Sequence, residues 1–305
     1  SHLAERLLKA GQNVVVVDDL STGSISNIAH LKKQKSFQFV RDTVRNASTM
    51  AVLAQRCDVI FHLAAAVGVQ LIVDRPVHTI ETNIHGTEVV LDAANRFGRK
   101  VLVASTSEVY GKSEAVPFRE DDDMLLGSTR FSRWSYACSK AIDEFLAFAY
   151  SQESGLDVVV ARLFNTVGPR QTGQYGMVVP RFVSKALQNE PIEIYGTGRQ
   201  SRCFCCVGDV VEALVGLMES PKAAGKVFNV GTTEETTISD LADRVVRLTG
   251  SKSRKVYVDY KTAYGREMDD MMRRVPSIER IKKTIGWQPE TSLDQTLKMI
   301  IRSLR

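Results

Sequence analysis

Short apolar runs alternate along the chain with longer stretches whose apolar residues repeat at helical spacing. The runs are rich in valine, which is typical of strands buried in a parallel sheet: Val14–Val17, Val59–Leu63, Val101–Ala104 and Val158–Ala161. Helical patterns lie between them, near residues 76–97 and 136–154. Because strands alternate with helices that can cover a sheet, the sequence predicts an α/β fold with a doubly wound parallel sheet.

The second half of the chain is less regular, because glycine and proline set several turns after residue 168. A further strand pattern, Lys226–Gly231, then resembles the buried strands of the first half. We expect a Rossmann-like domain over residues 1–168, to which residues 203–232 return. The remaining residues, 169–202 and 233–305, are expected to form a smaller, interleaved lobe that binds substrate.

Composition narrows the class of protein. The 305 residues are 44% hydrophobic and 25% charged, which is typical of a globular protein with a sizeable core. The net charge of +5 is spread along the chain, so we expect no nucleic-acid partner. We expect no membrane partner either, because no apolar run approaches the length of a membrane span.

The five cysteines are odd in number and lack metal-ligand spacing, which favours a reduced, cytoplasmic protein. Cys203, Cys205 and Cys206 lie in an apolar run with Phe204 and Val207. We therefore expect small buried side chains at these positions and no metal site.

A tyrosine and a lysine four residues apart, Tyr136 and Lys140, lie in the helical segment 136–154. Residues with this spacing share one helix face, so the ammonium can lie beside the phenol. A phenol has an ordinary pKa of about 10, and a neighbouring cation favours its ionised form. We expect Tyr136 to deprotonate an alcohol, with Lys140 lowering its pKa. The alternative is a packed tyrosine next to a surface lysine.

Two small hydroxyl residues and an acid, Thr106, Ser107 and Glu108, follow the apolar run Val101–Ala104. Ser107 or Thr106 could hydrogen-bond the same substrate hydroxyl as Tyr136. Together these groups would remove the hydroxyl proton while a hydride leaves for a cofactor.

The chain resembles the extended short-chain dehydrogenase/reductases that modify nucleotide-linked sugars. The resemblance covers essentially the whole sequence, and it implies an NAD-dependent enzyme. It rests on Tyr136 and Lys140 together with further segments: Val17–Gly23, His62–Ala65, Thr106–Gly111, Arg162–Arg170, Tyr195–Gly198 with Arg202, and Ile285–Pro289.

The cofactor side begins with Asp18, which closes the strand pattern Val14–Val17. A carboxylate there can accept both ribose hydroxyls of the adenosine and would repel a 2′-phosphate, which favours NAD over NADP. The alternative is a turn or helix-cap aspartate. The resemblance adds Asp42 near the adenine, Leu63, Ala64 and Ala65 along the cofactor, and Lys140 on the nicotinamide ribose. It also marks Asn83, for which the alternative is an N-cap that opens a helix.

The chain begins inside an amphipathic helix pattern, Ser1–Gly11, without the strand and glycine-rich turn that normally precede it in a dinucleotide-binding unit. We therefore expect that about fifteen to twenty residues of the parent protein precede Ser1, from the size of one strand and turn. A further alternative is an inactive family member that senses a dinucleotide. A chain without the strand and the glycine-rich turn would fit that alternative.

The resemblance implies oxidation at sugar carbon 4, and the following step is left open. Asp18–Gly23 and the stretch after His62 resemble UDP-glucose 4-epimerases. Thr106-Ser107-Glu108 instead resembles UDP-glucuronate decarboxylases and sugar-nucleotide 4,6-dehydratases, in which an acid handles protons near carbons 5 and 6. The interpretation leans slightly to a UDP-sugar 4-epimerase, with decarboxylase or dehydratase as the alternative.

The substrate-side residues are also implied by the resemblance. Asn165 is expected to hydrogen-bond the diphosphate or sugar, and Arg202 to bind the diphosphate, with a structural ion pair as the alternative. The resemblance also implies that Val179, Tyr195 and Arg273 contact the nucleotide. The alternatives are core packing for Val179 and Tyr195, and surface solvation for Arg273.

We also expect a homodimer through the 136–154 helix, with Ile142 and Phe145, paired with the Val89–Leu91 helix.

Overall fold

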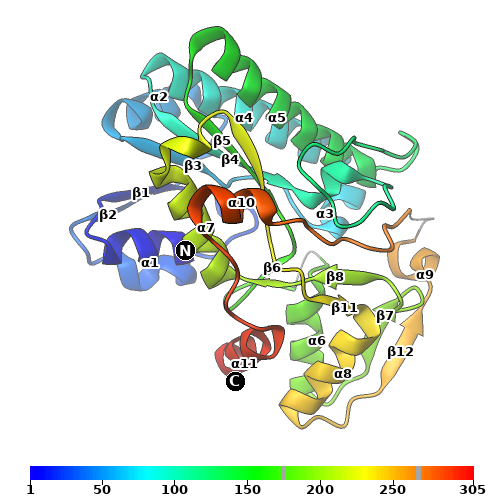
Figure 1. Ribbon diagram of the computed structural model, residues 1–305. Helices are drawn as coiled ribbons and strands as arrows, with labels where there is room; N and C mark the ends of the chain where they lie inside the picture. Colours follow the sequence, from blue (N-terminus) through cyan, green and yellow to red (C-terminus); the bar gives the residue numbers. More distant parts are fainter. Residues whose placement is uncertain (174–175, 266–268) are drawn as a thin grey trace.

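The computed structural model describes residues 1–173, 176–265 and 269–305 (Figure 1). Its centre is a parallel sheet in the order β10-β5-β4-β3. The strands are β3 (Val59–His62), β4 (Lys100–Thr106), β5 (Val158–Leu163) and β10 (Lys226–Val230). The predicted strands therefore form, and the return of the later segment to the sheet is confirmed because β10 pairs with β5.

Helices cover both faces of this sheet, as the alternating pattern predicts. Successive residues of β4 point to opposite faces, so Val101 and Val103 pack with α4 and α5, whereas Leu102 packs with α7. The helices are α4 (Pro76–Arg96), α5 (Arg133–Ser154) and α7 (Val207–Glu219), and Figure 1 shows α4 and α5 lying together. The doubly wound α/β prediction is confirmed.

Two further strands, β1 (Val14–Val17) and β2 (Phe37–Val40), pair with each other in parallel and form a separate two-stranded sheet. The sequence predicts a buried strand at Val14–Val17, but Val15 is 44% exposed and only Val14 is buried. The facing edge of the central sheet, at Val59, is 43% exposed. The prediction is wrong here because no described strand pairs with β1 on the side away from β2.

The first half also contains α1 (His2–Lys9), α2 (Ala47–Arg56) and α3 (Val69–Asp74). Three 3-10 helices occur among the described residues: η1 (Ile25–Leu31), η2 (Ser107–Tyr110) and η3 (Pro221–Ala223). Within the parts of the chain described, no helix is long and apolar enough to cross a membrane.

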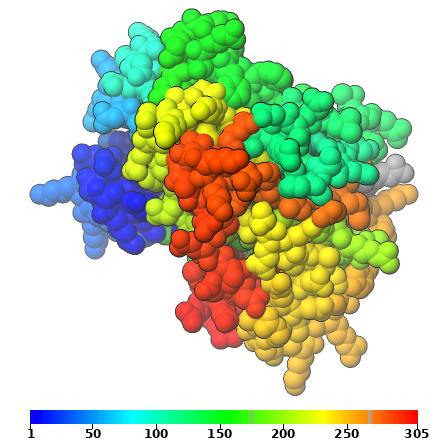
Figure 2. Space-filling view, in the orientation of Figure 1, coloured from blue at the N-terminus to red at the C-terminus, as the bar shows by residue number. Residues whose placement is uncertain are grey.

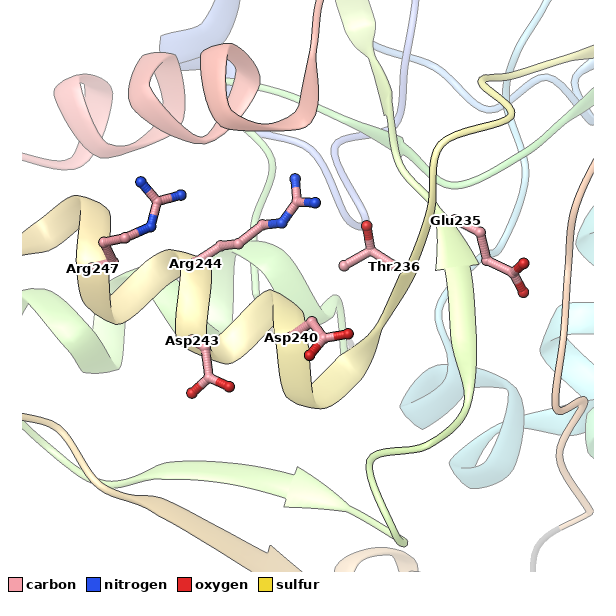
Figure 3. Close-up of a pocket in the computed structure, with 6 residues that line it drawn as sticks. All are labelled: Glu235, Thr236, Asp240, Asp243, Arg244 and Arg247. Atoms are coloured by element: carbon pink, nitrogen blue, oxygen red, sulfur yellow. The ribbon is translucent and has the colours of Figure 1, made fainter.

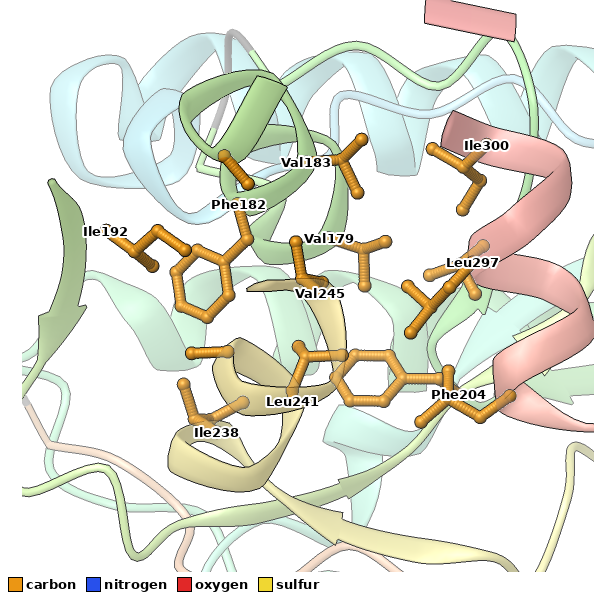
Figure 4. Close-up of a cluster of buried hydrophobic side chains, with 14 of the residues drawn as sticks. Val179, Phe182, Val183, Ile192, Phe204, Ile238, Leu241, Val245, Leu297 and Ile300 are labelled. Atoms are coloured by element: carbon orange, nitrogen blue, oxygen red, sulfur yellow. The ribbon is translucent and has the colours of Figure 1, made fainter. Parts of the chain in front are cut away.

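The smaller lobe is built around three helices, α6 (Val178–Leu187), α8 (Ile238–Thr249) and α11 (Leu293–Leu304). Figure 4 shows Phe182, Leu241 and Leu297 from these helices converging on one buried cluster with Phe204. Short strand pairs border it, namely β7 (Ile192–Tyr195) with β12 (Lys255–Val258), β8 (Ser201–Cys203) with β11 (Glu235–Thr237), and β6 (Thr166–Val167) with β9 (Cys205–Cys206).

The last part of the chain crosses between the two halves more often than the sequence predicts. After α9 (Tyr260–Tyr264), helix α10 (Glu279–Ile285) returns to the sheet domain, where Ile281 packs with β10 and α7. Trp287 Nε1 donates to the Asp209 carbonyl of α7 at 3.0 Å. Figure 2 shows this orange and red segment on the surface, running down to α11 at the lobe. The segment 233–305, which we expected to lie in the lobe, therefore includes α10, which packs against the sheet domain.

Candidate active site

The end of β4 places Thr106 against Tyr136 of α5. The Tyr136 phenol is 7% exposed and shares a hydrogen bond with the Thr106 side chain. Thr106 Oγ1 also accepts a hydrogen bond from the Glu108 backbone N–H at 3.3 Å, which starts the turn of η2. Ser107, the other hydroxyl candidate, is buried within that turn. Of the two, Thr106 is the residue that the fold brings to the phenol.

The pKa of the Tyr136 phenol lies above its ordinary value. Burial is the first cause, and the negative charge of Glu108 is the second. The Thr106 hydrogen bond and the positive charge of Arg274 act in the opposite direction. The expectation that Lys140 lowers this pKa stays a prediction, because burial and Glu108 outweigh the groups that act in that direction. Lys140 Nζ instead donates to Asp143 Oδ2 at 2.5 Å, and both side chains are buried.

Glu108 lies between two arginines that are distant in sequence. Its Oε1 accepts from Arg133 Nη2 at 3.4 Å and from Arg274 Nη1 at 3.3 Å. Its other oxygen, Oε2, is buried with no hydrogen-bond partner among the described residues. A buried carboxylate oxygen without a partner is costly, so this atom is available to a bound molecule.

Asp270 extends the cluster from the other side. It accepts hydrogen bonds from Arg133 Nη1 at 2.8 Å, Arg202 Nη2 at 2.9 Å and the Tyr260 hydroxyl at 2.7 Å. Burial opposes ionisation of Asp270, but the charges of Arg133 and Arg202 outweigh it and hold its pKa at about 2. Asp270 thereby fixes the guanidinium groups from α5 and β8 side by side.

Arg274 is the least compensated cation of this cluster. Burial, and next the positive charge of Arg202, lower the pKa of Arg274 to about 9. Three arginines, Arg133, Arg202 and Arg274, here face two carboxylates, Glu108 and Asp270, so the cluster carries 3 − 2 = +1. A buried surplus of positive charge favours an incoming anion.

Sequence reasoning missed three members of this cluster, Arg133, Asp270 and Arg274, and chose a neighbour of Arg274. It selected Arg273, which is exposed and binds Glu235 through two hydrogen bonds of 2.8 and 2.7 Å. The adjacent Arg274 points into the buried cluster instead. Arg133 carried a usable signal, because it lies three residues before Tyr136 on the same helix face. For the Arg273-Arg274 pair no local signal distinguishes the two side chains.

The structure places the other substrate-side candidates in different surroundings. Arg202 is 6% exposed and makes the ion pair with Asp270, which was its structural alternative. Val179 has no exposed surface and lies in the lobe's apolar cluster, which was its core-packing alternative. Tyr195 is partly exposed, with the Arg181 guanidinium 3.9 Å from its ring centroid. Asn165 is partly exposed between β5 and β6. Their substrate roles stay predictions.

Asn83 has a role different from the expected N-cap alternative. It lies in the interior of α4 and is 1% exposed. Its Oδ1 accepts from the Ala66 backbone N–H at 2.7 Å, and its Nδ2 donates to Ser139 Oγ at 3.2 Å. The N-cap interpretation is wrong, because α4 begins seven residues earlier at Pro76. Asn83 instead ties the loop after β3 to α5.

The cofactor-side residues lie at the carboxyl ends of the parallel strands. Asp18 follows β1 and is exposed, with one carboxylate oxygen accepting from the Leu20 N–H at 2.7 Å. Leu63 and Ala64 follow β3 and are exposed, and Ala65 is partly exposed. An exposed carboxylate at one strand end and small apolar residues at the next fit the adenosine side of NAD.

Asp42 is the cofactor-side candidate with the most internal partners. It accepts from the Thr43 N–H at 2.8 Å, Asn46 Nδ2 at 2.8 Å and Thr49 Oγ1 at 2.6 Å. These contacts, the Thr49 hydrogen bond first, lower the pKa of Asp42. It therefore organises the N-terminal turn of α2, and its contact with adenine stays a prediction.

Two other features of the surface and core take no part in this site. Figure 3 shows a surface hollow along α8, where Arg244 and Arg247 point toward α11 and pair with Asp294. It lies in the lobe, away from the phenol.

The three neighbouring cysteines, Cys203, Cys205 and Cys206, are buried, as predicted. Burial raises the pKa of Cys203 to about 12.

Comparisons with known proteins identify the family of this chain. The model of the family described as GDP-mannose 4,6 dehydratase matches residues 1–300. A UDP-N-acetyl-alpha-D-glucosaminuronate decarboxylase of Bacillus cytotoxicus is 38% identical, over 100% of this chain and 94% of that protein. UDP-glucuronic acid decarboxylase 1 of Danio rerio is 35% identical, over 99% of this chain and 69% of that protein.

A solved structure has the same fold. The structure of UDP-glucuronic acid 4-epimerase from Bacillus cereus, in complex with UDP-glucuronic acid and NAD, has a TM-score of 0.89 and 26% identity. The match covers 99% of this chain and 94% of that chain. The resemblance drawn from the sequence is thereby confirmed. The chain belongs to the GDP-mannose 4,6-dehydratase family, within the NAD-dependent extended short-chain dehydrogenase/reductases that modify nucleotide-linked sugars.

Proposed function

We propose that this enzyme decarboxylates a UDP-linked sugar acid of the UDP-glucuronate type. The observation that carries the proposal is Glu108, whose buried Oε2 has no partner among the described residues while its Oε1 bonds Arg133 and Arg274. A sugar acid brings one more carboxylate, which the net charge of +1 in this cluster can receive.

The first step takes place at sugar carbon 4. NAD, when bound, accepts a hydride from this carbon and later returns it. Tyr136 takes the proton of the 4-hydroxyl group, and Thr106 holds that hydroxyl in line through the hydrogen bond it makes with the phenol. The residues that would hold the cofactor are Asp18, Leu63, Ala64, Ala65 and Lys140.

The product of this step is a β-keto acid, because the carboxylate on carbon 5 is then next to a carbonyl at carbon 4. The bond between carbons 5 and 6 breaks, carbon dioxide leaves, and the electron pair forms an enolate. Glu108 passes a solvent proton to carbon 5, and Tyr136 returns its proton to the 4-oxygen as the hydride comes back. Overall one proton is consumed and no net oxidation occurs.

The relatives support this assignment over the 4-epimerase toward which the sequence leans. The Bacillus cytotoxicus and Danio rerio proteins are both sugar-acid decarboxylases, at 38% and 35% identity. An acid is needed near carbon 5 for decarboxylation, whereas an epimerase needs only rotation of the keto sugar. Glu108, beside Thr106, is the residue that we assign to this role.

A 4-epimerase acting on a sugar acid is the second candidate. It is favoured by the solved UDP-glucuronic acid 4-epimerase structure, which has the same fold over nearly the whole chain. Such an enzyme would use the same arginines to bind the carboxylate, but it would have to protect the β-keto acid from losing carbon dioxide.

Incubation with UDP-glucuronate, UDP-N-acetylglucosaminuronate and UDP-glucose, each with NAD, tests the proposal by mass spectrometry. Loss of carbon dioxide from a sugar acid is the expected result. An isomer of unchanged mass from any of the three would show an epimerase, and loss of water from UDP-glucose would show a dehydratase. Either result overturns the decarboxylase assignment.

We also propose that two copies of the chain associate through α4 and α5. Phe145 is 65% exposed and Ile142 40% exposed on α5, and Val77 is 66% exposed on the adjacent α4. Apolar surface of this extent on two contacting helices favours association with a second copy. The helix expected to take part with α5 is α4, whose residues Val89–Leu91 are themselves buried within the protomer. A cytoplasmic location, based on the five free cysteines, stays a proposal.

A further inference from the structure

Asp143 is a buried carboxylate next to the catalytic pair, and the reaction described above does not use it. Lys140 and Asp143 are three residues apart on α5, and Lys140 Nζ donates to Asp143 Oδ2 at 2.5 Å. The Lys140 side chain is 3% exposed and that of Asp143 is 0% exposed. The ammonium expected beside the phenol is therefore held by an acid of its own helix.

The surroundings of Asp143 offer it little further compensation. Its Oδ1 is buried with no hydrogen-bond partner that meets normal geometry among the described residues. The Thr87 hydroxyl of α4 faces the carboxyl and is hydrogen-bonded to His62 Nε2 of β3 at 3.0 Å. Burial first, and the Lys140 charge second, lower the pKa of His62 to about 3, so the imidazole is neutral. Lys140 is thus the principal partner of Asp143.

The adjacent acid, Glu144, shows what a structural carboxylate looks like on the same helix. It pairs with Arg162, accepting from Nε at 2.9 Å and from Nη2 at 2.7 Å, and it also accepts from Ser105 Oγ. Glu144 thereby joins α5 to β4 and β5. Asp143 makes no comparable link between elements, and a buried ion pair is by itself a weak source of stability.

We propose that Asp143 is a positioning residue of the active site, which holds the Lys140 ammonium in place and adds its own negative charge near the Tyr136 phenol. The inference rests on the proposed role of Tyr136 as the base. Three charged groups act on this phenol: Glu108 of η2, Arg274 before α10, and Asp143 itself. Asp143 raises the phenol's pKa, whereas Arg274 lowers it. Removing the Asp143 charge should make the phenol more acidic.

The direct test measures ionisation of the phenol in the protein without added cofactor or substrate. The near-ultraviolet phenolate band is titrated in the parent protein and in D143N, each minus its Y136F counterpart, so that only Tyr136 contributes. The amide of D143N can still accept a hydrogen bond from Lys140. We expect Tyr136 in D143N to ionise about one pH unit lower than in the parent protein.

Two further variants separate this effect from general damage to the helix. D143S removes the charge and also shortens the side chain, so it should lower the ionisation pH of Tyr136 as D143N does and also weaken NAD binding by about tenfold in calorimetry. E144Q removes a buried carboxylate next in sequence. It should lower the thermal unfolding temperature without moving the Tyr136 titration.

The proposal is overturned if D143N and D143S leave the Tyr136 titration unchanged, or if E144Q moves it equally. The acid limb of the kcat profile provides a second measurement, since it should shift to lower pH in D143N by the same amount. If the titration shifts but no substrate is turned over, the inference about Asp143 stands and the proposed reaction fails. The two conclusions can therefore be told apart.

Discussion

Arg274 Nη1 donates to Glu108 Oε1 at 3.3 Å, although the two residues are 166 positions apart in the sequence. Glu108 comes from the turn after β4, whereas Arg274 comes from the segment that leads back to the sheet domain before α10. The contact closes the cationic cluster over the catalytic phenol. It also makes the two halves of the chain contribute jointly to one site.

The Arg273-Arg274 doublet supplies a matched pair of variants. R274A removes the cation that would receive the sugar carboxylate, and we expect kcat/KM for UDP-glucuronate to fall about a hundredfold or more, or ~3 kcal/mol. R273A removes an exposed arginine bound to Glu235 and should change kcat/KM less than threefold. The steady-state rate of carbon dioxide release gives kcat/KM for both variants. Equal losses in the two variants would contradict the assignment of the cluster.

E108Q keeps the shape of the acid and removes its ability to pass a proton. Oxidation at carbon 4 should continue, so reduced cofactor should accumulate in E108Q, while steady-state carbon dioxide release falls by about two to three orders of magnitude because the enzyme stalls before carbon 5 is protonated. Absorbance of the reduced cofactor and mass spectrometry follow the two events separately. The exposed Glu114 lies in the same segment and supplies the control variant E114Q. Normal decarboxylation by E108Q would eliminate Glu108 as the proton donor.

Y136F should abolish hydride transfer, because it removes the phenol that is proposed to take the 4-hydroxyl proton beside Thr106. We expect turnover to fall by about three orders of magnitude or more, with UDP-sugar affinity in calorimetry within about threefold of the parent. Y257F, at an exposed tyrosine of β12, is the control and should remain active. Substantial turnover by Y136F would show that the phenol is not the base.

The Glu5–Arg170 ion pair should make stability depend on pH in the acid range. A hydrogen bond from Arg170 is the first cause that holds the pKa of Glu5 at about 2, below its ordinary value of 4.5. Stability from this pair is fully present above the unfolded pKa and is lost as pH falls from about 5 to 2. R170A should therefore lower the unfolding free energy on the order of 1 kcal/mol at pH 7.

The difference between this variant and the parent should shrink as pH falls toward 2, where Glu5 of the parent takes up its proton. Urea unfolding followed by circular dichroism at several pH values measures the difference. A difference that is constant across this range would show that Arg170 contributes through packing and not through the charge of Glu5.

F145E places a charge in the centre of the exposed apolar surface of α5. If two copies associate there, sedimentation velocity at micromolar concentration should show a dimer for the parent and a monomer for F145E. The control variant V52E changes an exposed valine on α2 and should leave the association unchanged. A monomeric parent protein would end the homodimer proposal.

Much of the fold could be predicted from local pattern. Valine-rich runs and helical spacing indicated the strands of the central sheet and helices α4 and α5, because periodicity records which face of an element is buried. The α10 segment was assigned to the wrong half. Its local pattern predicts an element but does not say against which of two cores that element will pack.

The catalytic candidates divide in the same way. Thr106, Glu108, Tyr136 and Lys140 were found because strand ends and helix faces bring neighbouring residues together by geometry alone. The same helix spacing allows Lys140 to reach either Tyr136 or Asp143, and the sequence analysis considered only the first. Burial decided between them, since an ammonium removed from water takes the nearest carboxylate.

By itself, the amino-acid sequence determined the family, the parallel α/β architecture, and the face of α5 that carries Tyr136 and Lys140. Only the tertiary structure decided that Arg133, Arg274 and Glu108 share one buried site, and that Arg273 does not. The physical reason is that helix and strand periods extend over a few residues, whereas compensation of buried charge depends on groups that the chain path brings together from distant segments.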